Sequence, residues 1–129
     1  MFKQTPVFSS YSVNDIDQAR DFYQSVLGLE VEQTKEGLNL KLQGSAVFLY
    51  PKADHQPATF TVLNFLVESI DSAVEMLEER GIALERYEMG EMSADEKGIY
   101  RGKASGKGPD IAWFKDPAGN ILSVIEGEE

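Results

Sequence analysis

The sequence predicts an α+β fold built from one βαβββ unit that is used twice. The first observation is an internal repeat, because VNDIDQA at residues 13–19 returns as VESIDSA at residues 67–73, 54 positions further along the chain. The second is that each copy leads into apolar residues at helical spacing. The third is that strand-like runs follow each helix. We therefore expect two copies of the order strand, helix, strand, strand, strand.

The first helix is predicted over about residues 15–27. Asp15 is a good N-cap residue, and Gln18 lies three positions later, where it can complete a capping box. Gly28 supplies the left-handed residue that often ends a helix. The apolar stripe consists of Ile16, Ala19, Phe22, Tyr23, Val26 and Leu27.

The second helix is predicted over about residues 69–80, with Ser69 as its N-cap and Gly81 after its end. Its apolar stripe consists of Ile70, Ala73, Met76 and Leu77. The opposite face carries Glu75, Glu78, Glu79 and Arg80. A charged stripe of this kind is typical of a solvated surface.

Three strand-like runs follow each helix. After the first helix they are residues 29–34, 38–42 and 46–50, and after the second they are residues 82–87, 111–115 and 121–126. The turn-forming sequence DPAGN joins the last two runs. An insertion with five glycines, at about residues 89–108, interrupts the second copy. Insertions of this length are usually functional or mobile.

The composition is that of a soluble, folded domain. The chain has 129 residues, of which 42% are apolar and 26% are charged. The lack of cysteine excludes disulfides, thiolate metal sites and cysteine nucleophiles. We see no apolar stretch typical of a signal peptide or a membrane span, so we expect a cytoplasmic protein.

The chain is strongly acidic. Twelve basic and 22 acidic residues give a formal net charge of -10. This charge repels nucleic-acid phosphates and anionic membrane surfaces, so we expect neither as a partner. The same charge attracts cationic small molecules, although an acidic surface also serves simply to keep a protein soluble.

Two segments carry a resemblance to a known family. The opening, with VNDI at residues 13–16, FY at 22–23 and VLGL at 26–29, resembles the start of a vicinal-oxygen-chelate module. The ending, WFKDPAGN at residues 113–120, resembles the end of one. Together with the repeat, the chain resembles the superfamily of glyoxalases, bleomycin-resistance proteins and dioxygenases.

The resemblance implies an architecture. It implies a single domain over residues 1–129, with module one at about 6–51 and module two at about 59–126. In this family the two modules form a curved mixed sheet around a cavity, and two chains commonly form a homodimer. The sequence leaves open whether the modules pair within a chain or across the dimer.

Metal-dependent members of the family hold a divalent ion with His and Glu side chains from four strands. The matching positions in this sequence are Phe8, Phe48, Val62 and Ser123. None of these is a usable ligand, so we expect no metal and no cofactor. Because a bound Lewis acid drives the classical reactions, we do not expect glyoxalase I or extradiol dioxygenase activity. His55, the only histidine, is expected to be exposed in a linker, and Glu126 stays a conceivable carboxylate near the cavity rim.

Side-chain alternation along the strands assigns two faces to the sheets. The face towards the helices is predicted to be apolar, with Val47, Leu49, Leu63, Phe65, Val67, Leu122 and Val124. The opposite face is predicted to carry Phe8, Ser10, Ser12, Phe48, Tyr50, Val62, Asn64, Leu66, Ile121, Ser123 and Ile125. Aromatic and small polar groups together are typical of a small-molecule pocket, whereas a dimer partner or a loop could also cover this face.

The leading hypothesis is a metal-independent protein that binds a small molecule, as the bleomycin-resistance branch of the family does. Its ligand would be a toxic, flat or cationic aromatic compound held by stacking and cation–π contacts. The predicted ligand-binding residues are Phe8, Ser10, Phe48, Tyr50, Val62, Asn64, Tyr100, Arg101, Trp113 and Ser123. For Trp113, ordinary core packing is the competing interpretation.

Two other functions stay open. The first is an enzyme of the same family, a lyase, isomerase or oxygenase-like protein, with a non-standard metal site or with acid–base groups such as Tyr50, Tyr100, Arg101 and Lys115. The insertion would then act as a lid. No catalytic residue can be assigned, because nothing in the sequence places these groups against each other. The second is a regulatory module whose concave face is filled by another protein chain.

Overall fold

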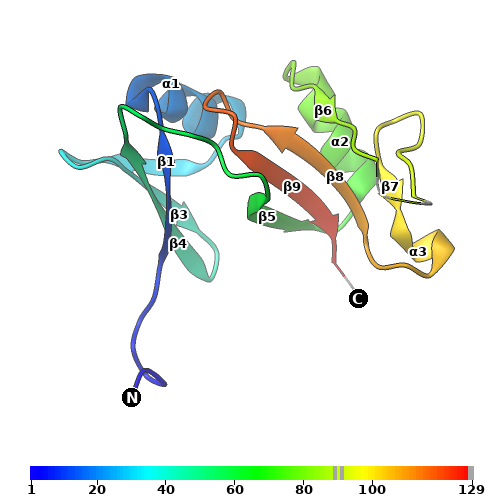
Figure 1. Ribbon diagram of the computed structural model, residues 1–129, viewed down its shortest axis with the longest axis horizontal. Coiled ribbons are helices and arrows are strands. Elements are labelled where there is room, and N and C mark those ends of the chain that lie inside the picture. Colours follow the sequence, from blue (N-terminus) through cyan, green and yellow to red (C-terminus); the bar gives the residue numbers. More distant parts are fainter. Residues whose placement is uncertain (89, 91, 128–129) are drawn as a thin grey trace. The chain divides into compact units, whose positions relative to one another are not determined.

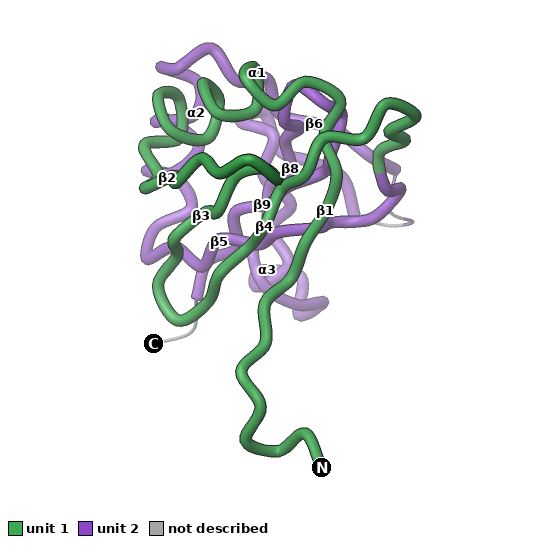
Figure 2. Tube along the Cα trace, turned by 90° about the vertical axis from the view of Figure 1, so that its left-hand side faces the viewer, with its two compact units in different colours: residues 1–57 green, residues 58–129 purple. Residues whose placement is uncertain are grey.

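The computed structural model describes residues 1–88, 90 and 92–127. Residues 89 and 91 of the predicted insertion therefore lie outside the described ranges. The chain forms two compact units, residues 1–57 and residues 58–129, which Figure 2 shows in different colours. Each unit contains one mixed sheet and at least one helix (Figure 1).

Unit 1, residues 1–57, has the order strand, helix, strand, strand, strand. Its elements are β1 (Ser9–Val13), α1 (Ile16–Arg20), η1 (Asp21–Val26), β2 (Glu30–Gln33), β3 (Leu38–Leu42) and β4 (Ser45–Pro51). The strand order in the sheet is β1-β4-β3-β2, in which β1 runs parallel to β4 and the other neighbours are antiparallel.

Unit 2, residues 58–129, repeats this arrangement with an insertion. Its elements are β5 (Thr61–Val67), α2 (Ile70–Glu79), β6 (Leu84–Glu85), β7 (Tyr100–Arg101), α3 (Gly102–Ser105), β8 (Asp110–Lys115) and β9 (Ile121–Glu126). The sheet order is β5-β9-β8-β6, and β7 also pairs with β8. Because this order matches that of unit 1, the predicted α+β fold of two βαβββ repeats is confirmed.

Both predicted helices form, and their polar caps explain where they begin. The Gln18 backbone N–H donates to the Asp15 side chain at 3.0 Å, and the Ser72 backbone N–H donates to the Ser69 hydroxyl at 3.3 Å. Both helices are followed by a glycine with positive φ, Gly28 at 74° and Gly81 at 78°. None of the helices in the described residues has the length and apolar composition that crossing a membrane requires.

The first helix differs from the prediction in its second half, where it is a π-helix over Asp21–Val26. The Leu27 backbone N–H donates to the Phe22 carbonyl at 2.9 Å, five residues back. The wider turn still buries Phe22 and Tyr23. Apolar spacing alone predicted an ordinary helix because it does not distinguish the two hydrogen-bond patterns.

The core of each unit lies between its sheet and its helices. In unit 1 the largest buried side chains include Tyr11 and Tyr23, whose hydroxyl groups are 2.9 Å apart. In unit 2 α2 packs on β8 and β9 (Figure 1). Val47, Leu49, Leu122 and Val124 are buried, which confirms these four as helix-facing positions, while Leu63, Phe65 and Val67 are half-buried.

The turn between β8 and β9 is organised by Asp116, which is 4% exposed. Its carboxylate accepts hydrogen bonds from the backbone N–H groups of Ala118 at 2.9 Å and Asn120 at 2.8 Å. The Asn120 side chain donates a third bond at 3.0 Å. The DPAGN segment therefore fixes the register of the two strands that carry Trp113 and Ser123.

We expect Asp116→Ala to lower the free energy of unfolding by about 2–3 kcal/mol, because three donors lose a charged acceptor in a buried turn. Urea unfolding followed by circular dichroism measures this change. Asp17→Ala is the matched control, since the Asp17 side chain is 72% exposed, and it should shift stability by less than about 0.5 kcal/mol. Equal urea midpoints for Asp116→Ala and the wild type would contradict the role of this turn.

Candidate ligand-binding sites

The four positions that the resemblance aligns with metal ligands carry side chains that do not fit a metal ion. Phe8 lies before β1 and is 69% exposed, and Phe48 is half-buried on β4. Ser123 is fully buried, and its hydroxyl donates to the Asn64 side-chain oxygen at 2.5 Å. Val62, the fourth position, is an aliphatic residue of β5. Within the described ranges, no three His, Cys, Asp or Glu side chains lie close enough to hold a metal ion.

Strand β5 contains a β-bulge that changes which side chains share a face. Thr61 pairs with Ile121, but Leu63 pairs with Leu122, so Val62 is the extra residue. The strict alternation predicted along β5 is therefore wrong at this point. On the face that carries Trp113 and Ile121 the structure places Thr61, whose hydroxyl accepts a hydrogen bond from Trp113 Nε1 at 3.0 Å.

An aromatic cavity of about 220 Å³ lies beside Trp113 in unit 2, and we name it the Trp113 pocket. It is lined by Thr59, Phe60, Thr61, Tyr87, Trp113 and Ile121. Two tyrosine rings form T-shaped contacts with the indole. The Tyr87 ring centroid lies 5.6 Å from that of Trp113, with 74° between the planes, and the Tyr100 centroid lies 5.0 Å away, with 69°. The pocket therefore presents a half-buried tryptophan held in a fixed orientation.

The Tyr87 hydroxyl is a buried polar group without a hydrogen-bond partner in the described part of the chain. Burial raises the pKa of this phenol, and the nearby Glu85 carboxylate acts in the same direction. The hydroxyl is thus protonated at neutral pH and can donate. A buried hydroxyl without a partner is rare in native proteins.

The Tyr87 backbone is fixed by the insertion. The Tyr100 hydroxyl donates to the Tyr87 carbonyl at 2.7 Å and accepts from the Tyr87 backbone N–H. Tyr100 itself is fully buried. Tyr100, a predicted ligand-binding residue, therefore lies against Trp113 and positions Tyr87 rather than lining the cavity.

Arg101, the next predicted ligand-binding residue, lies among carboxylates. It bonds to Asp71 at 2.8 and 3.2 Å and to Asp95 at 3.0 Å, and it lies 3.7 Å from Asp110. Asp71 belongs to α2 and Asp95 to the insertion. We name these four residues the insertion clamp, because Arg101 connects the insertion to the first turn of α2.

Two of the clamp carboxylates, those of Asp71 and Asp95, are held in their charged form. Hydrogen bonds from Arg101 and then Lys97 lower the pKa of Asp71 to about 2. Burial opposes ionisation of Asp95, but hydrogen bonds from the Ile99 backbone N–H and from Arg101 outweigh it and lower its pKa. Nearby, Glu126 accepts from the Ile70 backbone N–H at 3.1 Å and from Lys103 at 2.7 Å, so this carboxylate, too, has structural partners.

We expect the clamp to make the protein sensitive to acid. A folded pKa of about 2, below the ordinary 3.8, means that Asp71 stabilises the fold above about pH 4. This stabilisation is lost as the pH falls towards 2 and the carboxylate takes up a proton. Urea midpoints measured at several pH values from 5 to 2 should fall less steeply for Asp71→Asn than for the wild type. Asp17→Asn should keep the wild-type slope, and identical slopes for all three proteins would contradict the assignment.

In unit 1 the face away from the helices carries a pair of stacked aromatic rings. The Phe48 and Tyr50 ring centroids are 6.5 Å apart, with 19° between the planes. Ser10 and Ser12 on β1 pair in register with Phe48 and Tyr50 respectively. An open cavity of about 640 Å³ on this unit is lined by Val7, Phe8, Thr34, Glu36, Asn39, Ala46, Val47 and Phe48.

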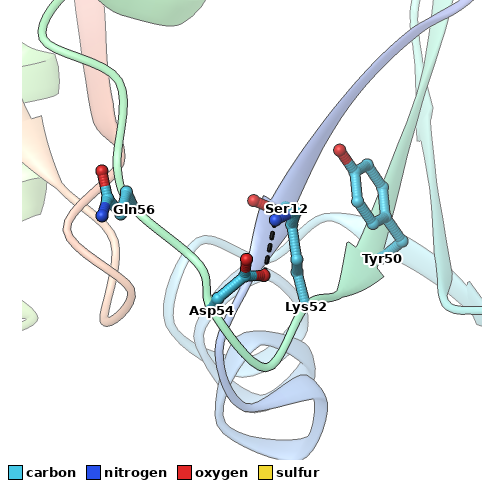
Figure 3. A pocket seen from close by; sticks show the side chains of 5 residues that line it. All are labelled: Ser12, Tyr50, Lys52, Asp54 and Gln56. Atoms are coloured by element: carbon cyan, nitrogen blue, oxygen red, sulfur yellow. Dashed lines mark hydrogen bonds and ion pairs between the residues drawn. The ribbon is translucent and has the colours of Figure 1, made fainter.

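A second cavity of unit 1, of about 370 Å³, is polar, and Figure 3 shows its lining side chains. They are Ser12, Tyr50, Lys52, Asp54 and Gln56, and we name this cavity the Tyr50 pocket. Ser12 Oγ lies 2.6 Å from His55 Nδ1, and His55 is half-buried. The expectation that His55 is an exposed linker residue is therefore wrong, because β1 supplies a partner 43 residues away in sequence.

The predicted site residues fall into separate groups. In unit 1 the structure brings together Phe8 and Phe48 in one cavity, with Tyr50 stacked on Phe48. In unit 2 it brings Tyr100 to Trp113, and it pairs Asn64 with Ser123. Sequence reasoning did not select Thr61 or Tyr87, which line the Trp113 pocket, because no local pattern marks a bulge or a hydroxyl without a partner.

Fold and sites together define a two-repeat βαβββ protein with pockets on the sheets of its units. The family described as the Glyoxalase/Bleomycin resistance protein/Dioxygenase superfamily matches residues 7–124. The chain belongs to this superfamily, which confirms the resemblance found in its sequence. No curated protein matches the chain.

Solved structures of the same fold have low sequence identity to this chain. A glyoxalase family protein from Enterococcus faecalis is 22% identical with a TM-score of 0.69, over 98% of this chain and 100% of that one. A genomically encoded fosfomycin resistance protein from Listeria monocytogenes is 13% identical with a TM-score of 0.68, over 97% and 94%. Lactoylglutathione lyase from Agrobacterium tumefaciens is 21% identical with a TM-score of 0.64, over 95% and 94%. At these identities the likeness concerns the fold alone.

Proposed function

We propose that this protein is a metal-independent small-molecule binding protein that sequesters a flat aromatic compound, including toxic or cationic ones. The observation that carries the proposal is the Trp113 pocket, in which the buried Tyr87 hydroxyl has no partner in the described residues. An aromatic wall with one unused hydrogen-bonding group matches a ligand that has a planar ring and a single polar substituent.

The size and lining of the pocket define the ligand class. At about 220 Å³ the cavity is smaller than the ~300–1,000 Å³ of typical ligand pockets, so it suits a ring system rather than a large compound. The indole and Phe60 supply apolar contact area, and Phe60 is 67% exposed. The Tyr87 hydroxyl would donate to a ring nitrogen or a carbonyl of the ligand, which gives orientation.

Charge adds a preference for cations. The net charge of -10 raises the local concentration of cationic ligands around the protein. A cation stacked on a tryptophan face gains about 0.5–2 kcal/mol, depending on how much water is excluded. We extend the proposal to a homodimer in the cytoplasm, as is common in this family, in which each chain contributes its own Trp113 pocket.

Binding is favoured over acid–base catalysis because three of the four groups named for catalysis, Tyr100, Arg101 and Lys115, are already engaged. Arg101 is bound to carboxylates, and Lys115 lies 3.4 Å from Glu85 in an ion pair. Tyr100 is fully buried, and its hydroxyl bonds to the Tyr87 backbone. Tyr100 thus positions the pocket wall, while Arg101 and Lys115 are held by carboxylates.

The test is a titration of the EDTA-treated protein with proflavine, a planar cationic dye. Binding is measured as a change in the fluorescence emission of the single tryptophan. We expect saturable quenching, and weaker quenching by the anionic dye anilinonaphthalene sulfonate. Tyr87→Phe should weaken proflavine binding about two- to tenfold through one lost hydrogen bond. Tyr11→Phe, which removes a buried hydroxyl from the core of unit 1, is the matched control and should leave binding unchanged. If neither dye binds saturably, the proposal fails.

A further inference from the structure

The Tyr50 pocket differs in chemistry from the Trp113 pocket. All five side chains that line it carry a polar group, and they come from β1, β4 and the segment that follows β4. Figure 3 shows Tyr50 and Ser12 on neighbouring strands, with Lys52, Asp54 and Gln56 along the segment beside them. An apolar aromatic ligand would leave these groups without partners, so this cavity requires a different occupant.

The charges of the pocket cancel. Lys52 and Asp54 are its only charged lining residues, and they form an ion pair at 2.5 Å (Figure 3). Hydrogen bonding to Lys52 lowers the pKa of Asp54, so the Asp54 carboxylate stays ionised beside the lysine at neutral pH. A charged ligand would have to compete with this pair, whereas a neutral ligand can bond to both partners. The pocket is thus locally neutral on a strongly acidic protein.

The hydrogen-bonding groups are varied and partly fixed in place. Asp54 only accepts, Lys52 only donates, and the hydroxyl groups and the Gln56 amide do both. The bond between Ser12 and His55 holds the serine side chain, and β1 pairs Ser12 with Tyr50 in register. A ligand with several hydroxyl groups, each able to donate and accept, matches this set. Preorganised partners also reduce the ordering required on binding.

Tyr50 supplies an apolar surface within the polar pocket. Its ring is half-buried and stacks on Phe48, which lines a different cavity, so the ring is supported from within the unit. A sugar ring has an apolar C–H face and a rim of hydroxyl groups, and tyrosine offers the complementary apolar body and polar tip. At about 370 Å³ the cavity lies near the lower end of the ligand-pocket range, which suits a single ring.

We infer that the Tyr50 pocket is a second binding site, separate from the Trp113 pocket, and that it takes a neutral polyhydroxylated ligand the size of one pyranose ring. Tyr50 provides the stacking surface, and Ser12, Asp54 and Gln56 bond to the hydroxyl groups. The site does not depend on the proposed binding of aromatic compounds, because no residue lines both pockets.

Saturation-transfer NMR with methyl α-D-glucopyranoside tests the inference. Ligand signals should appear with the wild-type protein at sugar concentrations up to about 20 mM, a range suited to millimolar affinity. They should fall at least about fivefold with Ser12→Ala and with Tyr50→Ala. Ser9→Ala is the matched control, since Ser9 is an exposed residue of β1 outside the pocket, and it should keep the wild-type signal.

Three further measurements keep the outcome decisive. If Tyr50→Ala fails to fold, Gln56→Ala replaces it, because Gln56 lies outside every strand and helix. Glucose 6-phosphate and glucosamine should bind no more tightly than the neutral sugar. A tenfold preference for either charged sugar, or no saturation transfer to methyl glucoside, would overturn the inference.

Proflavine quenching of Trp113 should persist in Tyr50→Ala. Failure of the sugar-binding inference is therefore distinguishable from failure of the proposed function.

Discussion

Replacing Trp113 with alanine is expected to abolish proflavine binding and to lower the free energy of unfolding by about 2 kcal/mol. The loss of affinity should exceed tenfold, because a central aromatic side chain commonly dominates a binding site. The stability change is smaller than the ~3–5 kcal/mol of a fully buried tryptophan because Trp113 is half-buried. The variant loses the ring contacts with Tyr87 and Tyr100 and the hydrogen bond to Thr61.

Proflavine fluorescence anisotropy measures binding in this variant, since the tryptophan signal is absent, and urea unfolding measures stability. Trp113→Phe separates the two effects, because it keeps a ring in the pocket but loses the bond to Thr61. Compared with Trp113→Ala, Trp113→Phe should recover most of the lost free energy of unfolding and part of the lost affinity for proflavine. Phe2→Ala is the control, as Phe2 is 75% exposed and should change neither quantity. Wild-type affinity in Trp113→Ala would contradict the assignment of the pocket.

Replacing Arg101 with methionine is the second change with a large expected effect. The substitution leaves Asp71, Asp95 and Asp110 near one another without their shared cation. We expect a loss of about 1–2 kcal/mol, between the ~0.2–1 kcal/mol of an exposed ion pair and the ~3–5 kcal/mol of a buried one. Because Tyr100 belongs to the insertion and contacts Trp113, we also expect weaker proflavine binding.

Hydrogen exchange at the Ile99 amide reports on the clamp directly, since this N–H donates to Asp95 at 2.9 Å. Exchange should be faster in Arg101→Met than in the wild type. Arg101→Lys should restore the slow exchange in part, because lysine keeps the charge but cannot form the bidentate hydrogen bonds of arginine. Arg20→Met, which removes a half-buried arginine of unit 1 that pairs with Asp17 and Asp21, should leave exchange at Ile99 unchanged. Unchanged exchange in Arg101→Met would show that the clamp does not hold the insertion.

The parts of the fold that sequence predicted are those fixed by local chemistry. Asp15 and Ser69 begin the two helices as capping residues, and Gly28 and Gly81 follow their ends. The apolar runs form strands within a few residues of their expected bounds, although the run at 82–87 is reduced to β6, Leu84–Glu85. The insertion supplies β7 and α3 within the region predicted as a long loop.

The parts that sequence missed depend on long-range pairing. The bulge at Val62 appears only when β5 is aligned with β9, and it places Thr61 beside Trp113. The partner of His55 lies 43 residues away, and Arg101 meets Asp71 across 30 residues. The sequence marks Trp113 only as an aromatic residue, and the tertiary structure shows its T-shaped contacts with Tyr87 and Tyr100.

Metal dependence of ligand binding tests the central claim most directly. The EDTA-treated protein is titrated with proflavine before and after addition of nickel, zinc, manganese or iron, and native mass spectrometry measures bound metal in the same samples. We predict the same dissociation constant in every sample and no stoichiometric ion, because Phe8, Phe48, Val62 and Ser123 offer no ligand set. One tightly held ion per chain, together with ligand binding that requires it, would contradict this account.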